Sequence, residues 1–236
     1  MMKFIVEKRI FENIENLCVG VVVARGIDNS KKYPSIQKML DTSIQTASEN
    51  FLDKKVKEDD RIIPYRDAFL KIGINPNKYQ CSVEAMFNRI SKGKVLPSIN
   101  PLVDLNNAIS LKYTLPMGTH DLSLSDDDIY MRFSHDGDLF QPMGGDIVED
   151  VPSGEVVYAV GNQVRTRRWT WRQSDEGKID EKTNYVFFPI DGFYGVNEKR
   201  VEEARKELEM ILKDVFHCEV VSGMVDKDHP SFEWNL

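Results

Sequence analysis

The sequence has few cysteines and no long apolar run. Its three cysteines, Cys18, Cys81 and Cys218, are odd in number and share no short spacing, which argues against a disulfide framework and a zinc site. No segment approaches the roughly 20 apolar residues that span a bilayer. The charged N-terminus also lacks the apolar segment of a signal peptide. We therefore expect a cytoplasmic protein with no membrane contact.

The chain also lacks the common motifs of nucleotide and hydrolase chemistry. It contains no G-x-x-x-x-G-K-[ST] loop, no G-x-G-x-x-G turn, no H-E-x-x-H helix and no G-x-S-x-G elbow. Its four histidines, His120, His135, His217 and His229, are scattered without the usual spacing of metal ligands. We expect neither a metal nor a cofactor.

The chain has fewer basic than acidic residues, 31 Lys and Arg against 38 Asp and Glu, which gives a net charge of −7. A protein that holds nucleic acid mainly through its phosphates is usually basic. Any contact with RNA must therefore use a local basic patch or be brief. The hydrophobic content of 41% is enough for a substantial core, and 236 residues suit one domain.

Hydrophobic periodicity predicts helices at both ends of a central set of strands. Helices are expected over 35–56, 65–71, 82–90, 101–114 and 198–216, with Ser82 as an N-cap. Strands are expected over 2–6, 18–24, 129–133, 155–160, 163–172, 184–190 and 219–225. Gly161-Asn162 suits a hairpin turn, and Asp136-Gly137 suggests another turn. This order favours a single α+β domain with a mixed or antiparallel sheet core flanked by helices.

Residues 99–121, INPLVDLNNAISLKYTLPMGTHD, begin with polar side chains at a predicted helix start. Asn100 and Asp104 can accept hydrogen bonds from the backbone N–H groups that a helix start leaves free. Asn107 lies one turn further along. We interpret all three residues as structural.

The same segment ends in a short run that includes a histidine. Pro116 ends the helix, and Gly118 permits backbone shapes that few residues tolerate. His120 then stands beside Asp121. The pattern leaves two interpretations of His120 open, a catalytic residue or an ordinary loop histidine.

The segment VRTRRWTWRQ has the most unusual composition in the chain. In a strand, Arg165, Arg167, Trp169 and Trp171 share one side, and Arg168 and Arg172 lie on the other. Guanidinium groups bind phosphates and flat aromatic rings stack on bases, so all six are candidate RNA-binding residues. In the alternative interpretation the tryptophans are core residues and the arginines pair with the surplus acids.

The chain resembles one known family. The pattern Asn100-x-x-Val103-Asp104-x-x-Asn107, followed by Pro116-Met117-x-x-x-Asp121, is similar without a gap to the tRNA-editing B3/B4-type domain of the phenylalanyl-tRNA synthetase beta subunit. Weaker similarity at 82–89 and 183–193 extends the match over roughly residues 60–195, and RRWTWRQ is similar to stand-alone relatives of the domain. Residues 1–236 are therefore expected to form one stand-alone B3/B4-like domain without the aminoacylation domain of the full subunit.

The resemblance implies a substrate pocket with altered chemistry. In the family, this domain hydrolyses the ester that links wrongly attached tyrosine to tRNA. The pocket is expected at Gly118, Asp121, Tyr158 and Pro189. Gly118 takes the place of the family's editing histidine, with His120 two positions later, and Pro189 takes the place of the glutamate that recognises the tyrosine hydroxyl. Because an apolar pocket discriminates poorly between a side chain with a hydroxyl group and one without it, tyrosine is not the expected substrate.

Two functions follow from the resemblance. The first is a deacylase that hydrolyses a misacylated aminoacyl-tRNA in trans, with His120 as the catalytic residue that orients or deprotonates water. Its partners are then a transiently bound tRNA or aminoacyl-tRNA, with a synthetase as a further candidate. The second is a non-catalytic module that binds an amino acid, an aminoacyl-tRNA or a protein partner. The acidic charge and the two replaced editing residues favour the second.

Overall fold

A four-stranded sheet contains the long buried strands of the chain. Its order is β11 (Glu219–Val225), β2 (Leu17–Arg25), β10 (Tyr185–Phe193) and β3 (His120–Asp121), and each neighbouring pair is antiparallel. β2 and β10 are nine residues long and, apart from Arg25, are buried throughout. Strands covered on both faces have near-continuous apolar sequences, as these do. The strands predicted over 18–24, 184–190 and 219–225 are confirmed.

The second sheet is larger and mixed. Its order is β12 (Ser231–Trp234), β1 (Met2–Val6), β4 (Ile129–Phe133), β7 (Val156–Val160), β8 (Gln163–Arg167), β5 (Leu139–Phe140) and β6 (Glu149–Asp150), with β9 (Arg172–Gln173) beside β8. β1 pairs with β4, and β5 with β8, in parallel, whereas the other pairs are antiparallel. The predicted Gly161-Asn162 turn closes the β7–β8 hairpin, with Gly161 at φ 57°.

Helices cover the outer face of the four-stranded sheet. α5 (Pro101–Tyr113) and α6 (Glu198–Asp214) pack beside each other there, and α2 (Pro34–Asn50) packs on α5. α3 (Ile63–Lys71), α4 (Ser82–Ser91) and the 3₁₀ helix η1 (Val56–Glu58) follow α2, and α1 (Lys8–Asn13) follows β1. α6 approaches β10 closely because Gly192 has no side chain, and a Cβ there would overlap Val201.

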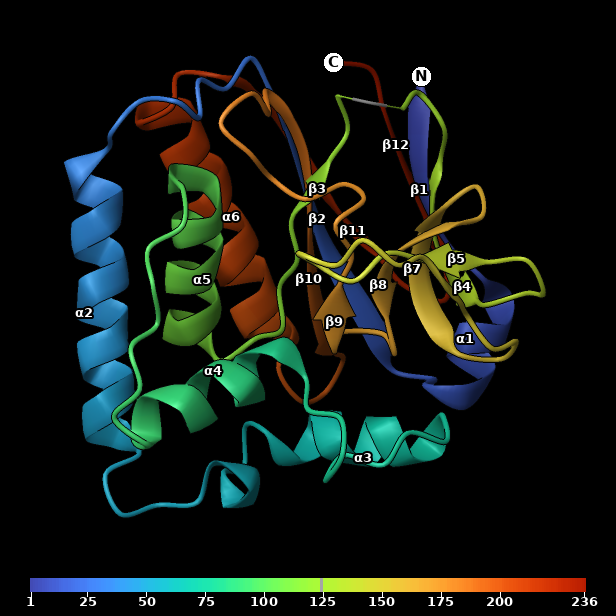
Figure 1. The fold of residues 1–236 in the computed structure, drawn as a ribbon, viewed down its shortest axis with the longest axis horizontal. Helices are drawn as coiled ribbons and strands as arrows, with labels where there is room; N and C mark the ends of the chain where they lie inside the picture. Colours follow the sequence, from blue (N-terminus) through green and yellow to red (C-terminus); the bar gives the residue numbers. More distant parts are fainter. Residues whose placement is uncertain (124) are drawn as a thin grey trace.

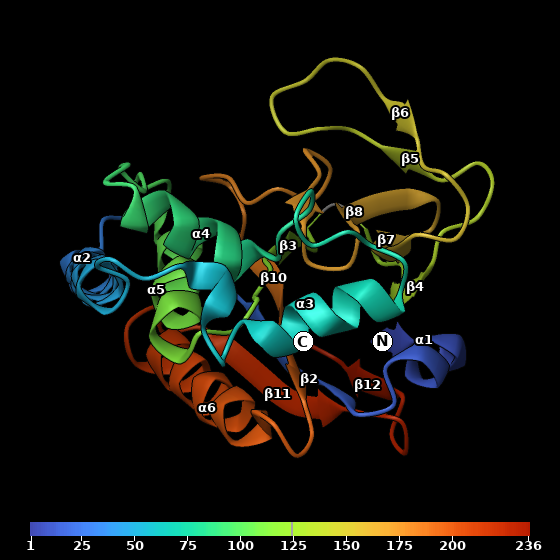
Figure 2. The same cartoon turned by 90° about the horizontal axis from the view of Figure 1, so that it is seen from below.

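These elements form successive layers in one domain. The computed structural model describes residues 1–123 and 125–236. Figure 1 shows α2 on one side, then α5 and α6, then the four-stranded sheet, and last the larger sheet, with the two termini close together. From below, the segment between β5 and β6 extends away from the body (Figure 2). The predicted α+β fold class is confirmed.

No helix in the described ranges combines the length and the apolar character that crossing a membrane requires.

Three local predictions are wrong. The helix expected over 35–56 ends at Asn50. Cys81 is the N-cap of α4, so Ser82 is the first helical residue and not the cap. The strand expected over 163–172 ends at Arg167, because Arg168 and Trp169 adopt the left-handed conformation at φ 48° and 60°. The expected alternation of side chains along 163–172 therefore stops at that turn.

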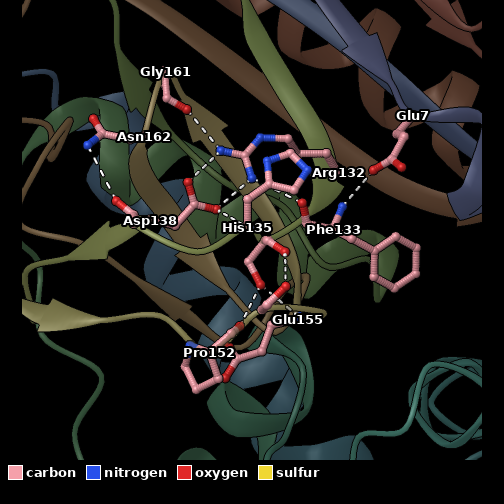
Figure 3. Close-up of polar contacts among 12 residues, drawn as sticks. Glu7, Arg132, Phe133, His135, Asp138, Pro152, Glu155, Gly161 and Asn162 are labelled. Carbon is pink, nitrogen blue, oxygen red and sulfur yellow. Dashed lines mark hydrogen bonds and ion pairs between the residues drawn. The ribbon is translucent and has the colours of Figure 1, made fainter.

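A buried ion pair anchors the loop after β4 (Figure 3). Arg132 Nη1 and Nη2 donate to Asp138 Oδ2 and Oδ1 at 2.6 and 2.8 Å, and Nη2 also donates to the Gly161 carbonyl at 2.9 Å. The backbone N–H of His135 donates to Asp138 as well, at 2.8 Å. Burial opposes ionisation of Asp138, but the bonds from Arg132 and His135 outweigh it and lower its pKa. The Arg132 guanidinium thus ties the loop to the β7–β8 turn. Gly137, at φ 88°, lies in a turn at the predicted position, but β4 pairs with β1 and β7 and not with β5, so this turn closes no hairpin.

We expect Asp138→Ala to lower the free energy of unfolding by about 3 kcal/mol, because it leaves the Arg132 guanidinium buried without its counter-charge. The contribution of the carboxylate is present above the pKa of the unfolded aspartate and is lost as pH falls through the lowered folded-state pKa. Denaturant unfolding should therefore show the gap between wild type and variant closing in acid.

The control for this experiment is Lys206→Ala, which removes an exposed ion pair with Glu202. It should change the free energy of unfolding by less than about 0.5 kcal/mol. Equal losses in the two variants would contradict the anchoring role of Asp138.

Candidate functional site

A small cavity lies where the four-stranded sheet meets the larger one. Its volume is about 70 Å³, about half that of a cavity that holds benzene. β3 and β10 line it from one sheet, β7, β8 and the turn after β8 from the other, and α4 contributes its first residue. We term it the inter-sheet pocket; its walls are formed by Ser82, Met117, Gly118, His120, Tyr158, Thr166, Trp169, Thr170, Trp171, Arg172, Gln173, Pro189 and Asp191.

Asp191 is a buried carboxyl group on the pocket wall. Its Oδ1 accepts hydrogen bonds from the Tyr158 hydroxyl at 2.8 Å and from Trp169 Nε1 at 2.7 Å. Within residues 1–123 and 125–236, its Oδ2 makes no hydrogen bond. Burial raises the pKa of Asp191 to about 7, although the two hydrogen bonds oppose this shift. The carboxyl group therefore holds its proton to a much higher pH than an ordinary aspartate does.

His120 is buried in the same pocket. It lies in β3 opposite Phe187 of β10, and its ring centroid is 5.6 Å from that of Tyr158 and 5.7 Å from that of Phe187. Burial, and then the positive charge of Arg165, lower the pKa of His120 to about 3. The imidazole is therefore neutral at physiological pH, with one N–H donor and one acceptor nitrogen.

Three polar atoms of pocket-lining residues are fully buried and have no hydrogen-bond partner among the described residues. They are Ser82 Oγ, His120 Nδ1 and Thr170 Oγ1. Nearly all buried polar atoms in proteins are hydrogen-bonded, and an unpaired one costs about 1–3 kcal/mol. The groove between α2 and α5 is larger, about 500 Å³, but the described residues place no such atom on its walls. The inter-sheet pocket is thus the better candidate for a polar ligand.

Most of the substrate-pocket residues implied by the resemblance lie together. Gly118, Tyr158 and Pro189 line the inter-sheet pocket with His120. A Cβ at Gly118 would lie 3.2 Å from Pro189 Cγ and 3.3 Å from His120 Nε2. Glycine at this position therefore allows the imidazole and the proline ring to approach the same stretch of backbone.

Asp121 and the polar residues predicted at the start of α5 do not line the pocket. Asp121 accepts a hydrogen bond from Thr183 Oγ1 at 2.5 Å. Asn100 is the N-cap of α5 and accepts from the backbone N–H three residues later at 3.1 Å. Asp104 accepts from the backbone N–H of residue 99 at 2.8 Å. Asn107 is half-buried in the next turn of the helix.

The arginines expected to bind RNA are mostly paired with acids. Arg165 lies 3.8 Å from Glu176, Arg167 contacts Glu149 at 3.0 Å and Glu155 at 2.6 Å, and Arg168 contacts Glu155 at 2.9 Å. Arg165 and Arg167 are also buried. These contacts agree with the alternative interpretation, in which the arginines pair with surplus acids, and RNA binding by these three residues stays a prediction.

The two tryptophans of this segment differ in their surroundings. Trp169 is fully buried and donates to Asp191, so it is a core residue with no face open to a base. Trp171 is half-buried on the pocket wall, edge-on to Tyr79 at 4.7 Å between ring centroids, and Arg172 beside it is exposed. Trp171 and Arg172 are the members of the predicted set that lie at the pocket and keep exposed surface.

Asp191 was not among the site residues predicted from the sequence. Its signal is a lone acidic residue inside the apolar run YVFFPIDGF, two residues after Pro189. Residues two apart share one face of a strand, so the expected position of Pro189 already placed Asp191 on the pocket side. Ser82 was missed for a different reason, because its expected role as a cap concealed a hydroxyl group that has no backbone partner.

We expect Asp191→Asn to flatten the pH dependence of stability. The folded-state pKa of about 7 lies above the ordinary value of 3.8, so the stabilising contribution of the protonated group is fully present below about pH 4 and is lost as pH rises through about 7. Between pH 5 and 8, wild type should lose about 2.5 kcal/mol relative to the variant in urea unfolding. Parallel stability curves for the two proteins would contradict the raised pKa.

Comparisons with known proteins agree with this architecture. The family model of the B3/4 domain matches residues 64–213. The structure is similar to an N-terminal fragment of the phenylalanyl-tRNA synthetase beta subunit from Pyrococcus horikoshii, with a TM-score of 0.51 and 10% sequence identity. The alignment covers 94% of this chain and 53% of that one, so the chain spans about half of the fragment's length. No curated protein matches the sequence. The predicted resemblance is confirmed, and the chain belongs to the B3/4 domain family.

Proposed function

We propose that this chain binds the aminoacylated 3′ end of a tRNA in the inter-sheet pocket and hydrolyses the ester of a misacylated tRNA in trans. The observation that carries the proposal is the meeting of His120, Asp191 and two unpartnered hydroxyl groups in one small pocket of a B3/4 domain. A few convergent polar groups in a mostly apolar pocket are typical of a ligand site.

The proposed reaction needs little from the protein, because an aminoacyl ester is already activated. The site has to place a water molecule and stabilise the developing oxyanion. Neutral His120 accepts a hydrogen bond from the water and directs its oxygen toward the carbonyl carbon. The hydroxyl groups of Ser82 and Thr170 donate to the oxyanion. The ester bond then breaks, and the ribose oxygen leaves with the proton that the water gives up through the imidazole.

The size of the pocket favours a small aminoacyl group. Its volume of about 70 Å³ is about half that of a cavity that holds benzene, roughly 150 Å³. Pro189 on its wall has no hydrogen-bonding side chain to read a hydroxyl. The proposed substrate therefore carries a small side chain, and tyrosine is disfavoured.

The proposed RNA contact is small. Trp171 offers a partly exposed ring for the terminal base and Arg172 an exposed cation for the backbone nearby. With three neighbouring arginines held by acids and a net charge of −7, binding is brief and confined to the end of the tRNA. We place this activity in the cytoplasm, where charged tRNA and a synthetase partner are found.

One observation favours the second candidate function, a non-catalytic aminoacyl-binding module. The pKa of His120, about 3, makes the imidazole a weak base, since general bases work best with a pKa near the operating pH. A binding module needs only the hydrogen bonds that this neutral ring can make.

Ester loss from a panel of charged tRNAs separates the two functions. We expect wild type to hydrolyse a charged tRNA with a small aminoacyl group, and His120→Ala to slow this by about 10²-fold. His229→Ala is the control, because that side chain is 79% exposed, and it should leave the rate unchanged. Absence of ester loss across the panel would contradict hydrolysis and leave binding as the function.

Trp171→Ala should weaken binding of the charged tRNA by about tenfold, the usual effect of removing one aromatic stacking surface. The measurement is a titration of labelled tRNA at fixed, stated salt. Tyr194→Ala removes another exposed aromatic residue, outside the pocket, and should not change the affinity. Equal effects of the two substitutions would contradict the role of Trp171 as the stacking surface for the terminal base.

A further inference from the structure

The Asp191 side chain accepts no bond from a cation or from a backbone N–H, unlike the other buried acids of the described residues. Asp104 and Asp121 also lack a cation, but each accepts from a backbone N–H, at 2.8 and 2.7 Å. Glu84 pairs with Arg66 at 2.6 Å, and Asp138 pairs with Arg132 at 2.6 Å. No cation of the described residues pairs with Asp191, whose two hydrogen bonds come from neutral donors and both end on Oδ1. A buried carboxylate is unfavourable without a counter-charge. The wall that Asp191 shares with the pocket is where a ligand can supply one.

The rings around Asp191 suit a cation. Tyr158 and Trp171 line the pocket together with the neutral ring of His120, and the buried Trp169 packs behind them. Aromatic faces carry negative electrostatic potential and attract ammonium groups. Arg172, the remaining charged residue on the wall, is exposed, so its charge is screened by solvent and competes weakly for the buried carboxylate.

We propose that Asp191 binds the α-ammonium group of the aminoacyl moiety. This subsite rests on the proposed function, because it assumes that an aminoacyl group enters the inter-sheet pocket. The ammonium group donates to Oδ2, which is free, while Tyr158 and Trp169 hold Oδ1 in place. The ligand must therefore have a free amino group. N-acylated aminoacyl esters and peptidyl esters lose the charge that pairs with the carboxylate.

Three stable analogues of a tRNA end test the subsite on the wild-type protein. They are 3′-alanylamino-3′-deoxyadenosine, the matched compound in which a hydroxyl replaces the amino group, and the N-acetylated form of the first. We expect the amino compound to bind at least about tenfold more tightly than the other two, as for one charge-assisted hydrogen bond. Calorimetry or ligand-observed NMR measures the affinities.

Asp191→Asn keeps an acceptor for Tyr158 and Trp169 but removes the charge. In this variant the amino compound should bind no better than the hydroxyl compound. Asp104→Asn is the matched control, because it replaces a buried carboxyl group outside the pocket and should keep the tenfold preference. Equal binding of the amino and hydroxyl compounds to wild type, a preference that survives in Asp191→Asn, or no binding of any analogue at millimolar concentration would each overturn the subsite.

Failure of the subsite and failure of the proposed function give different results. Ester loss from charged tRNA, together with equal binding of the amino and hydroxyl compounds, retains the function and rejects the subsite. A preference for the amino compound that Asp191→Asn abolishes, without ester loss, retains the subsite and rejects hydrolysis.

Discussion

Asp191 connects several layers of the fold through its side chain, its backbone carbonyl and its backbone N–H. From β10, its side chain accepts hydrogen bonds from Tyr158 in the other sheet and from Trp169 in the turn after β8. Its carbonyl accepts from the Tyr65 hydroxyl of α3, and its N–H donates to the carbonyl of Pro116 after α5. Both sheets and two helical segments therefore meet at one carboxyl-bearing residue. Its burial keeps a proton-binding group poised near neutral pH.

The same arrangement determines what the inter-sheet pocket can recognise. Because Trp169 and Tyr158 close around Asp191, the space left is small and its unpaired atoms are polar. The ion pairs that bury Arg165 and Arg167 remove positive charge from the surface beside it. The pocket thus suits a compact ligand held by a few directed bonds, and the surrounding surface suits a brief encounter with nucleic acid more than stable binding.

The sequence predicts the features that depend on local pattern and misses those that depend on tertiary contact. Apolar runs identify β2 and β10, and Gly161-Asn162 supplies the positive φ that its hairpin needs. The strand predicted over 163–172 is wrong at Trp169, because this residue adopts the left-handed conformation, which is rare for residues other than glycine. In that conformation its indole N–H donates to Asp191, a tertiary contact that the local pattern does not reveal. The acids that bind Arg167 lie 12 and 18 positions away in sequence, so its burial follows from sheet pairing that residue spacing does not reveal.

The central claim is that the space between the two sheets receives an aminoacyl group. A crystal structure of the protein with 3′-alanylamino-3′-deoxyadenosine tests it most directly. The account predicts the aminoacyl end between β10 and β7, with its nitrogen within hydrogen-bonding distance of Asp191 and its carbonyl near Ser82 or Thr170. Density for the compound elsewhere, with the inter-sheet pocket holding water alone at saturating ligand, would contradict it.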